Sequence, residues 1–177
     1  MAYYVAQDGP GVLGPRGWRC FGLYGSNGYI LIVTPEAHAE DLFSDNSALK
    51  GPAIQLSTSN GDTSGRFEVA RVAARLFPTK QAFVRQVIAE GIEPADDFPA
   101  GPFPSDRLTY QSPTRVEFET PADATGFGTV SRLTKTGDPI DGFAEMTEDN
   151  NLIVLDVRLP AKLRSLASAI IREAERR

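Results

Sequence analysis

The sequence predicts an α+β fold in which a mainly antiparallel sheet is covered by a helix pair and a C-terminal helix. Three observations support this prediction. Short apolar runs are separated by turn-forming residues, two amphipathic helices follow each other in mid-chain, and a further amphipathic segment closes the sequence. Strands and helices do not alternate as they do in βαβ units, which favours an antiparallel sheet. At 177 residues, a single domain over residues 1–177 is expected.

The first hairpin is expected around Trp18, the only tryptophan of the chain. One strand is predicted over residues 18–24 and a second over residues 29–34. They are joined by a Gly-Ser-Asn-Gly turn, whose Gly and Asn residues accept the left-handed backbone of a tight connection. Residues 29–33 are all apolar, without polar alternation. They are therefore predicted to form a central strand that is covered on both faces.

Two helices are predicted on either side of Pro78. Apolar residues recur at helical spacing before this proline, and Thr79 is expected to cap a second helix that stops at Gly91. The closing helix should begin at Pro160, a residue suited to a first turn. Its apolar stripe consists of Leu163, Leu166, Ala167, Ile170, Ile171 and Ala174. These three helices are expected to cover one or both faces of the sheet.

The other elements are predicted from shorter patterns. Further strands are expected over residues 3–7 (at an edge), 53–57, 108–111, 115–120, 143–146 and 152–159, and a short helix over residues 35–43. In the last strand Ile153, Leu155 and Val157 alternate with residues that include Asp156 and Arg158, so mostly one of its faces should be buried. Residues 9–14 spell GxGxxG, but Pro15 to Trp18 follow where a dinucleotide site needs a helix, so a plain loop is expected.

Composition and charge exclude several classes of protein. The apolar fraction of 41% and the charged fraction of 23% are ordinary for a globular domain. The net charge of −5 disfavours binding to nucleic acid and to anionic membranes. No apolar run approaches the roughly 18 residues of a membrane span, so membrane insertion is not expected.

The inventory of reactive residues is small. His38 is the only histidine and Cys20 the only cysteine, which excludes an internal disulfide and leaves too few N and S ligands for a typical zinc site. Cys20 lies in a predicted apolar strand, where a thiol is more often packing than nucleophile. Asp138, Asp141 and Glu145 lack the alternating pattern of a calcium loop. Neither a metal site nor a cofactor is predicted.

The loop over residues 58–66 is the best candidate for a site. It follows a predicted strand and precedes a predicted helix, where backbone N–H groups and a nearby arginine can hold an anion. The candidate ligand-binding residues are Thr58, Asn60, Thr63, Ser64 and Arg66. An alternative is that Thr63 or Ser64 is simply the N-cap of the following helix. A second alternative is a nucleophile, because GDTSG fits G-x-T-x-G with Thr63 in the serine position.

Four segments resemble an uncharacterised family of exported proteobacterial proteins: residues 11–28, 63–78, 103–113 and 157–171. The resemblance implies a periplasmic or secreted protein whose leader is missing from this sequence, but it carries no activity and no site residues. The Pro-x-Gly-Trp segment that ends at Trp18, with the two strands after it and the closing helix, also resembles PsbP/Mog1-like α+β domains.

A non-enzymatic exported binding or accessory protein is therefore the leading hypothesis, with an unknown small molecule or protein as its partner. One alternative is a small hydrolase that uses Thr63 or Ser64 with His38. Another is a cytoplasmic protein-interaction module. A pocket with convergent polar groups would favour binding, whereas a histidine or acid beside Thr63 or Ser64 would favour hydrolysis.

Overall fold

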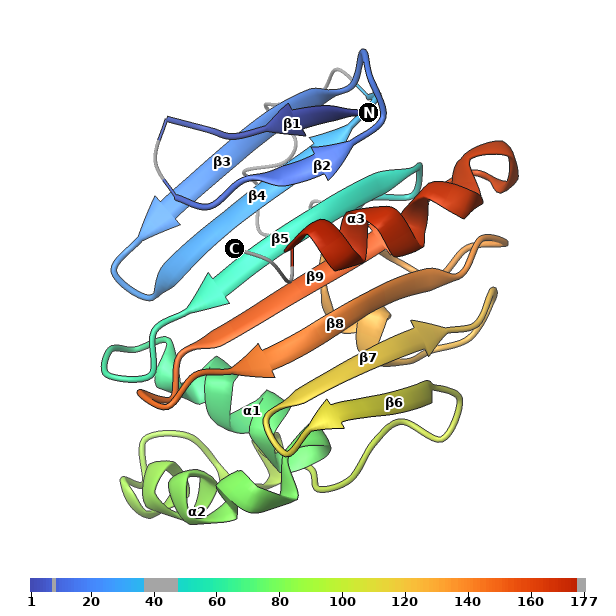
Figure 1. Cartoon of the computed structure of the whole chain (residues 1–177). Helices are drawn as coiled ribbons and strands as arrows, with labels where there is room; N and C mark the ends of the chain where they lie inside the picture. Colours follow the sequence, from blue (N-terminus) through green and yellow to red (C-terminus); the bar gives the residue numbers. More distant parts are fainter. Residues whose placement is uncertain (8, 37–47, 175–177) are drawn as a thin grey trace.

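The structure is a computed structural model that describes residues 1–7, 9–36 and 48–174. Its centre is a seven-stranded antiparallel sheet, in the order β3-β4-β5-β9-β8-β7-β6 (Figure 1). The strands are β3 (Arg19–Gly25), β4 (Gly28–Thr34), β5 (Ala53–Ser59), β6 (Arg107–Ser112), β7 (Arg115–Thr120), β8 (Ile140–Met146) and β9 (Leu152–Arg158). The predicted α+β class with a mainly antiparallel sheet is confirmed.

Helices and a small ribbon cover the two faces of this sheet. On one face lie α1 (Arg66–Leu76), α2 (Gln81–Ala89) and the 3-10 turn η4 (Phe127–Val130). On the other face lie α3 (Ala167–Ala174) and a two-stranded ribbon of β1 (Ala2–Tyr4) and β2 (Val12–Gly14). The buried apolar side chains accordingly form two clusters, one under α1 and α2 and one under α3 and the ribbon. Short 3-10 turns also occur over Pro78–Lys80, Ala95–Asp97 and Ala161–Leu166.

The apolar spacing of its sequence explains the helix pair. Val69, Val72, Ala73 and Leu76 are buried on one side of α1, and the helix ends before Pro78, as predicted. The start of α2 differs from the prediction. Residues Pro78–Lys80 form a 3-10 turn, and Lys80 rather than Thr79 occupies the cap position. The hydroxyl of Thr79 donates instead to the carbonyl of Pro113.

Other boundaries also need correction. The predicted central strand β4 is covered on both faces as expected, but it is second from the edge of the sheet. The edge strand expected over residues 3–7 is β1, which pairs with β2 outside the main sheet. The predicted loop over residues 9–14 contains β2 itself. Pro160 begins a 3-10 turn, and the α-helix starts only at Ala167. The helix expected over residues 35–43 falls mostly outside the described residues.

The largest difference between the predicted and the observed fold concerns the burial of β9. Its alternating pattern predicts one buried face, yet β9 is the middle strand of the sheet and both of its faces are buried. Asp156 and Arg158 point to the α1 face in the same series as Leu152 and Val154, and their exposed fractions are 0% and 1%. Two ionisable side chains therefore lie within the core.

None of the helices within residues 1–7, 9–36 and 48–174 is long and apolar enough to cross a membrane.

Candidate ligand-binding cavity

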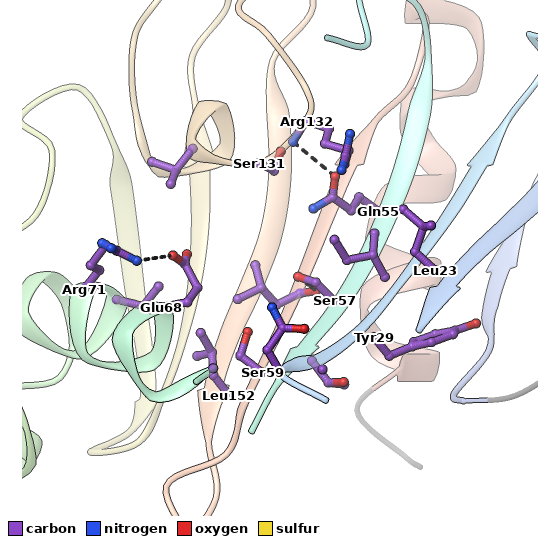
Figure 2. A pocket seen from close by; sticks show the side chains of 18 of the residues that line it. Leu23, Tyr29, Gln55, Ser57, Ser59, Glu68, Arg71, Ser131, Arg132 and Leu152 are labelled. Atoms are coloured by element: carbon purple, nitrogen blue, oxygen red, sulfur yellow. Dashed lines mark hydrogen bonds and ion pairs between the residues drawn. The ribbon is translucent and has the colours of Figure 1, made fainter. Parts of the chain in front are cut away.

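A cavity of about 970 Å³ lies on the α1 face of the sheet. The helix pair packs mainly over the half of this face formed by β9, β8 and β7. The chain between β7 and β8, which includes η4, crosses the same face and pairs with residue 49. A space remains over β3, β4, β5 and β9, between α1 and the segment after η4 (Figure 2).

The wall of the cavity combines apolar and polar side chains. Its apolar side chains are Leu23, Ile30, Phe67, Val72, Phe127, Val130, Leu152 and Val154. Gln55, Ser57 and Ser59 line it from β5, and Ser131 and Arg132 from the segment after η4. Apolar surface beside polar groups is typical of sites that bind small organic molecules, where the apolar part holds the ligand and the polar groups orient it.

Asp156 borders the cavity and is its most unusual group. It lies on β9 between Gln55 of β5 and Gly142 of β8, and neither carboxyl oxygen has a hydrogen-bond partner in the part of the chain that the structure describes. A Cβ on Gly142 would lie 2.7 Å from Cζ of Phe118, so an aromatic ring occupies the space beside the carboxyl. Burial raises the pKa of Asp156 well above its usual range, because a charge there loses hydration without gaining a partner.

The ionised groups at the cavity form a paired cluster. Arg71 on α1 donates to Glu68 at 3.3 Å and to Glu93 at 2.5 Å, and its guanidinium lies 5.7 Å from the centre of the Phe98 ring. Figure 2 shows Glu68 and Arg71 facing the sheet from α1. Across the cavity, the backbone N–H of Arg132 donates to Oε1 of Gln55 at 3.1 Å, which ties the segment after η4 to the floor.

Two polar side chains, Asp106 and Arg158, hold the wall of the cavity that η4 and the segment after it form. Asp106 accepts the N–H of Phe127 at 2.8 Å and the hydroxyl of Thr120 at 2.7 Å, and this hydroxyl accepts the N–H of Gly128. Arg158 donates to the carbonyl groups of Leu49, Gly51 and Thr134. Burial lowers the pKa of Arg158, and the nearby Asp138 and Glu36 oppose this effect. These hydrogen bonds anchor this wall of the cavity to the sheet.

The loop predicted from the sequence contributes to the cavity in part. Thr58 and Ser64 line its wall together with Ser59 and Gly65. Gly65 is the N-cap of α1 and makes no side-chain cap bond, so the alternative in which Thr63 or Ser64 is the N-cap is wrong. Residue 65 is a glycine because the position is crowded: a Cβ there would lie 2.3 Å from the carbonyl oxygen of Asn27.

The remaining predicted residues have structural contacts. Asn60 donates to the Ser26 carbonyl at 3.3 Å, and the Thr63 hydroxyl donates to the Asn60 carbonyl and accepts the N–H of Gly65. Arg66 makes a bidentate pair with Glu90 and donates to the Thr63 carbonyl. Hydrogen bonding between Arg66 and Glu90 raises the pKa of the former and lowers that of the latter. The pair connects the start of α1 to the end of α2.

The residues of the hydrolase hypothesis are only partly described. His38 lies outside the described residues, so its predicted pairing with Thr63 or Ser64 stays a prediction. Cys20 packs with the cluster under α3 and the ribbon, which is the face of the sheet opposite the cavity, and its Sγ contacts the Val5 carbonyl at 3.7 Å.

The three carboxylates of the calcium-loop comparison, Asp138, Asp141 and Glu145, have separate surroundings. Asp138 pairs with Arg164 and Glu145 with Arg115. The pKa of Asp141 is raised by burial first and by the neighbouring Glu119 second. Over the residues that the structure describes, no group of three or more His, Cys, Asp or Glu side chains is placed to hold a metal ion.

Sequence reasoning missed Asp156, which is the centre of the site. Its position in an apolar strand was visible, but the alternation with Ile153, Leu155 and Val157 is also what a solvent-exposed face would show. A signal was available in the run Leu152–Leu155, where four successive apolar residues indicate a strand covered on both faces.

Comparison of the chain with models of known protein families, with curated proteins and with solved structures finds no match.

Proposed function

We propose that this protein is a non-enzymatic binding protein, and that it holds a small, largely apolar molecule in the cavity on the α1 face of its sheet. The single observation that carries this proposal is the Asp156 carboxyl, which is buried at the cavity and has no hydrogen-bond partner among the described residues.

An unpartnered buried carboxyl is costly for a folded protein. Leaving a buried polar group without a hydrogen bond costs on the order of 1–3 kcal/mol. Such groups are rare in native structures, and those that occur call for an explanation. A bound molecule that hydrogen-bonds the carboxyl supplies one, because it completes a polar group that the fold leaves open beside an apolar space.

The shape of the site supports small-molecule binding. Its volume is in the range of natural ligand sites, and aromatic and aliphatic side chains line it beside polar groups. The Glu68–Arg71–Glu93 cluster is already paired, and we assign the polar contacts of the ligand to Asp156 and to the β5 side chains Gln55 and Ser57, which line the cavity beside it.

The proposal is tested by filling the cavity. Ser57 is a half-buried residue on the floor, and Ser57→Phe places a ring in the space that the ligand would occupy. Binding of N-phenyl-1-naphthylamine, an uncharged apolar dye, is measured by fluorescence titration. We expect the wild-type protein to bind the dye and Ser57→Phe to bind it at least about tenfold more weakly, a loss of about 1.4 kcal/mol.

Thr109→Phe is the matched control, because it adds the same ring on the exposed edge strand β6. It should leave dye binding unchanged. Equal affinity of wild type and Ser57→Phe, with both proteins folded by circular dichroism, would reject the cavity as the binding site. Failure of the wild-type protein to bind the dye or any of the small probes described below would reject the proposed function.

We further propose that the protein acts after export, as the resemblance of its segments to exported proteins implies. Fractionation of cells that express the complete natural gene tests this location: recovery in the periplasm or medium supports it, and recovery only with the cytoplasmic proteins contradicts it.

A further inference from the structure

We propose that the molecule bound in the cavity carries a basic nitrogen, and that this nitrogen pairs with the carboxyl of Asp156. The inference rests on the proposed function and specifies the chemical class of its ligand: a small amine with an apolar body.

The first argument concerns hydrogen-bonding capacity. Both carboxyl oxygens of Asp156 are without partners among the described residues, and the group borders the cavity beside Gln55. An ionised carboxylate accepts hydrogen bonds only, and a protonated amine supplies up to three donors together with the opposite charge. Charge-assisted bonds of this kind are about twice as strong as neutral ones.

The second argument concerns the charge balance of the cavity. The formally charged side chains that line it, apart from Asp156, are Glu68, Arg71, Glu93 and Arg132. Two acids and two bases sum to zero, so a neutral Asp156 leaves the cavity neutral. If Asp156 ionises, a single positive charge restores the balance, whereas an anionic ligand would leave the cavity with a net negative charge.

The third argument concerns the proton. Burial raises the pKa of Asp156 and so favours the neutral carboxyl in the empty protein. When an ammonium ion binds, its positive charge reverses this preference. The O–H bond of the carboxyl breaks, its proton passes to solvent, and the ammonium pairs with the carboxylate. An uncharged amine would instead take the same proton, with no net release. Since alkyl amines have a pKa of about 10, the first route applies at neutral pH.

The carboxyl is closed to water in this structure, with an exposed fraction of 0%. A ligand therefore reaches it only as neighbouring side chains move. Gln55, which lies directly opposite Asp156 on β5 and is itself 5% exposed, is the adjacent polar group on the cavity floor.

The other ionisable groups that face this site have to be separated from Asp156 in any pH measurement. They are Glu68 and Arg71 on α1, Glu93 after α2, Arg132 after η4, and Arg158 two residues further along β9. The variant Asp156→Asn keeps all of them and removes only the titration of Asp156, so it isolates the contribution of this carboxyl.

The test compares amines with alcohols of the same shape. The probes are 2-phenylethylamine against 2-phenylethanol, and tryptamine against tryptophol, each used to displace the naphthylamine dye from the full chain. We expect at least one amine to bind the wild-type protein about tenfold or more tightly than its alcohol. In Asp156→Asn the two members of each pair should bind within about twofold of each other.

The pH dependence of binding gives a second readout. Affinity of the amine for wild type should rise with pH, by up to about tenfold per unit while Asp156 is still protonated in the free protein, and affinity of the alcohol should stay flat. Calorimetry in phosphate and in Tris buffer should show a net release of up to about one proton per amine bound. The pH slope and the proton release should both vanish in Asp156→Asn.

The outcomes separate the two proposals. If the dye and the alcohols bind but neither amine gains over its alcohol, the cavity is a binding site and the basic nitrogen is wrong. An amine preference that persists in Asp156→Asn overturns the assignment to Asp156. If nothing binds, the proposed function itself fails.

Discussion

At the scale of the residue, Asp156 determines both the chemistry of the cavity and a weakness of the fold. Its carboxyl is buried on the middle strand, with Gln55 opposite and Gly142 on the other side. A carboxyl at this place contributes nothing to packing that an apolar side chain would not contribute better. The fold tolerates it in the neutral form, and the pH at which it ionises becomes a property of the whole protein.

This gives a prediction about stability and pH. The folded pKa of Asp156 is raised above its unfolded value of 3.8, so above about pH 4 the folded state holds a proton that the unfolded state has lost. The free energy of unfolding should therefore fall as pH rises from about 4 toward the folded pKa, with a slope approaching −1.4 kcal/mol per pH unit, about the value for one proton. Urea unfolding at a series of pH values should show this slope in wild type and a flatter profile in Asp156→Asn.

The matched control is Asp141→Asn. Asp141 on β8 has a pKa that is raised in the same direction by burial and by Glu119, but it is only half-buried. Its removal should take away a smaller part of the slope. If Asp156→Asn keeps the full wild-type slope, the carboxyl of Asp156 is not the group that titrates.

At the scale of the element, η4 and its flanks form a wall of the cavity that is anchored at several points. Phe127 packs edge-to-face on Phe118 with ring centres 4.9 Å apart, and its N–H is accepted by Asp106. Asp106 also accepts the hydroxyl of Thr120, which orients it. The carboxylate of Asp106, the residue before β6, is therefore the anchor at the η4 end of this wall.

Replacing this carboxylate should loosen the wall. Asp106→Ala leaves the Phe127 N–H without its acceptor, and we expect a loss of about 1–2 kcal/mol in the free energy of unfolding. Hydrogen exchange should rise in residues 126–134 before it rises in the sheet, because the wall opens locally. Asp123→Asn is the control, because it removes an exposed carboxylate on the same segment while asparagine tolerates the left-handed backbone of this position (φ 58°), and it should leave exchange over residues 126–134 unchanged. Unchanged exchange in Asp106→Ala would show that packing alone holds the wall.

The elements also show what the sequence could predict. Hairpins were predictable where glycine and asparagine separate apolar runs, and α1 and α2 where apolar spacing meets Pro78. Strand β2 was missed because its residues, Val12–Gly14, lie among glycines and prolines that normally mark loops. The burial of β9 was missed because Asp156 and Arg158 are residue types that almost never lie in a core without partners. Arg158 has partners in three backbone carbonyls, and no local pattern reveals these.

At the scale of the whole molecule, the order of the strands was beyond local reasoning. The chain leaves β5 through α1 and α2, forms β6 at the far edge, and returns by hairpins to β9, which then pairs with β5. Gln55 and Asp156 are paired although they lie about a hundred positions apart in the sequence. The local periodicity of apolar residues cannot predict such a contact. The cavity depends on this pairing, since its floor is β5 and β9 together, and that is why only its Thr58–Ser64 edge was predictable.

The same pairing predicts how the protein unfolds. Because β5 from the first half of the chain and β9 from the second half form the middle of one sheet, neither half can lose its structure without exposing both apolar clusters. Unfolding should therefore be a single cooperative transition, which is what the predicted single domain would show. Trp18, which packs under the α3 face, reports on the first half through its fluorescence, and far-UV circular dichroism reports on the whole sheet. The two urea curves should coincide in midpoint and slope. A tryptophan transition at lower urea than the circular dichroism transition would mean that the N-terminal strands detach first, and that the ladder between β5 and β9 does not couple the two halves.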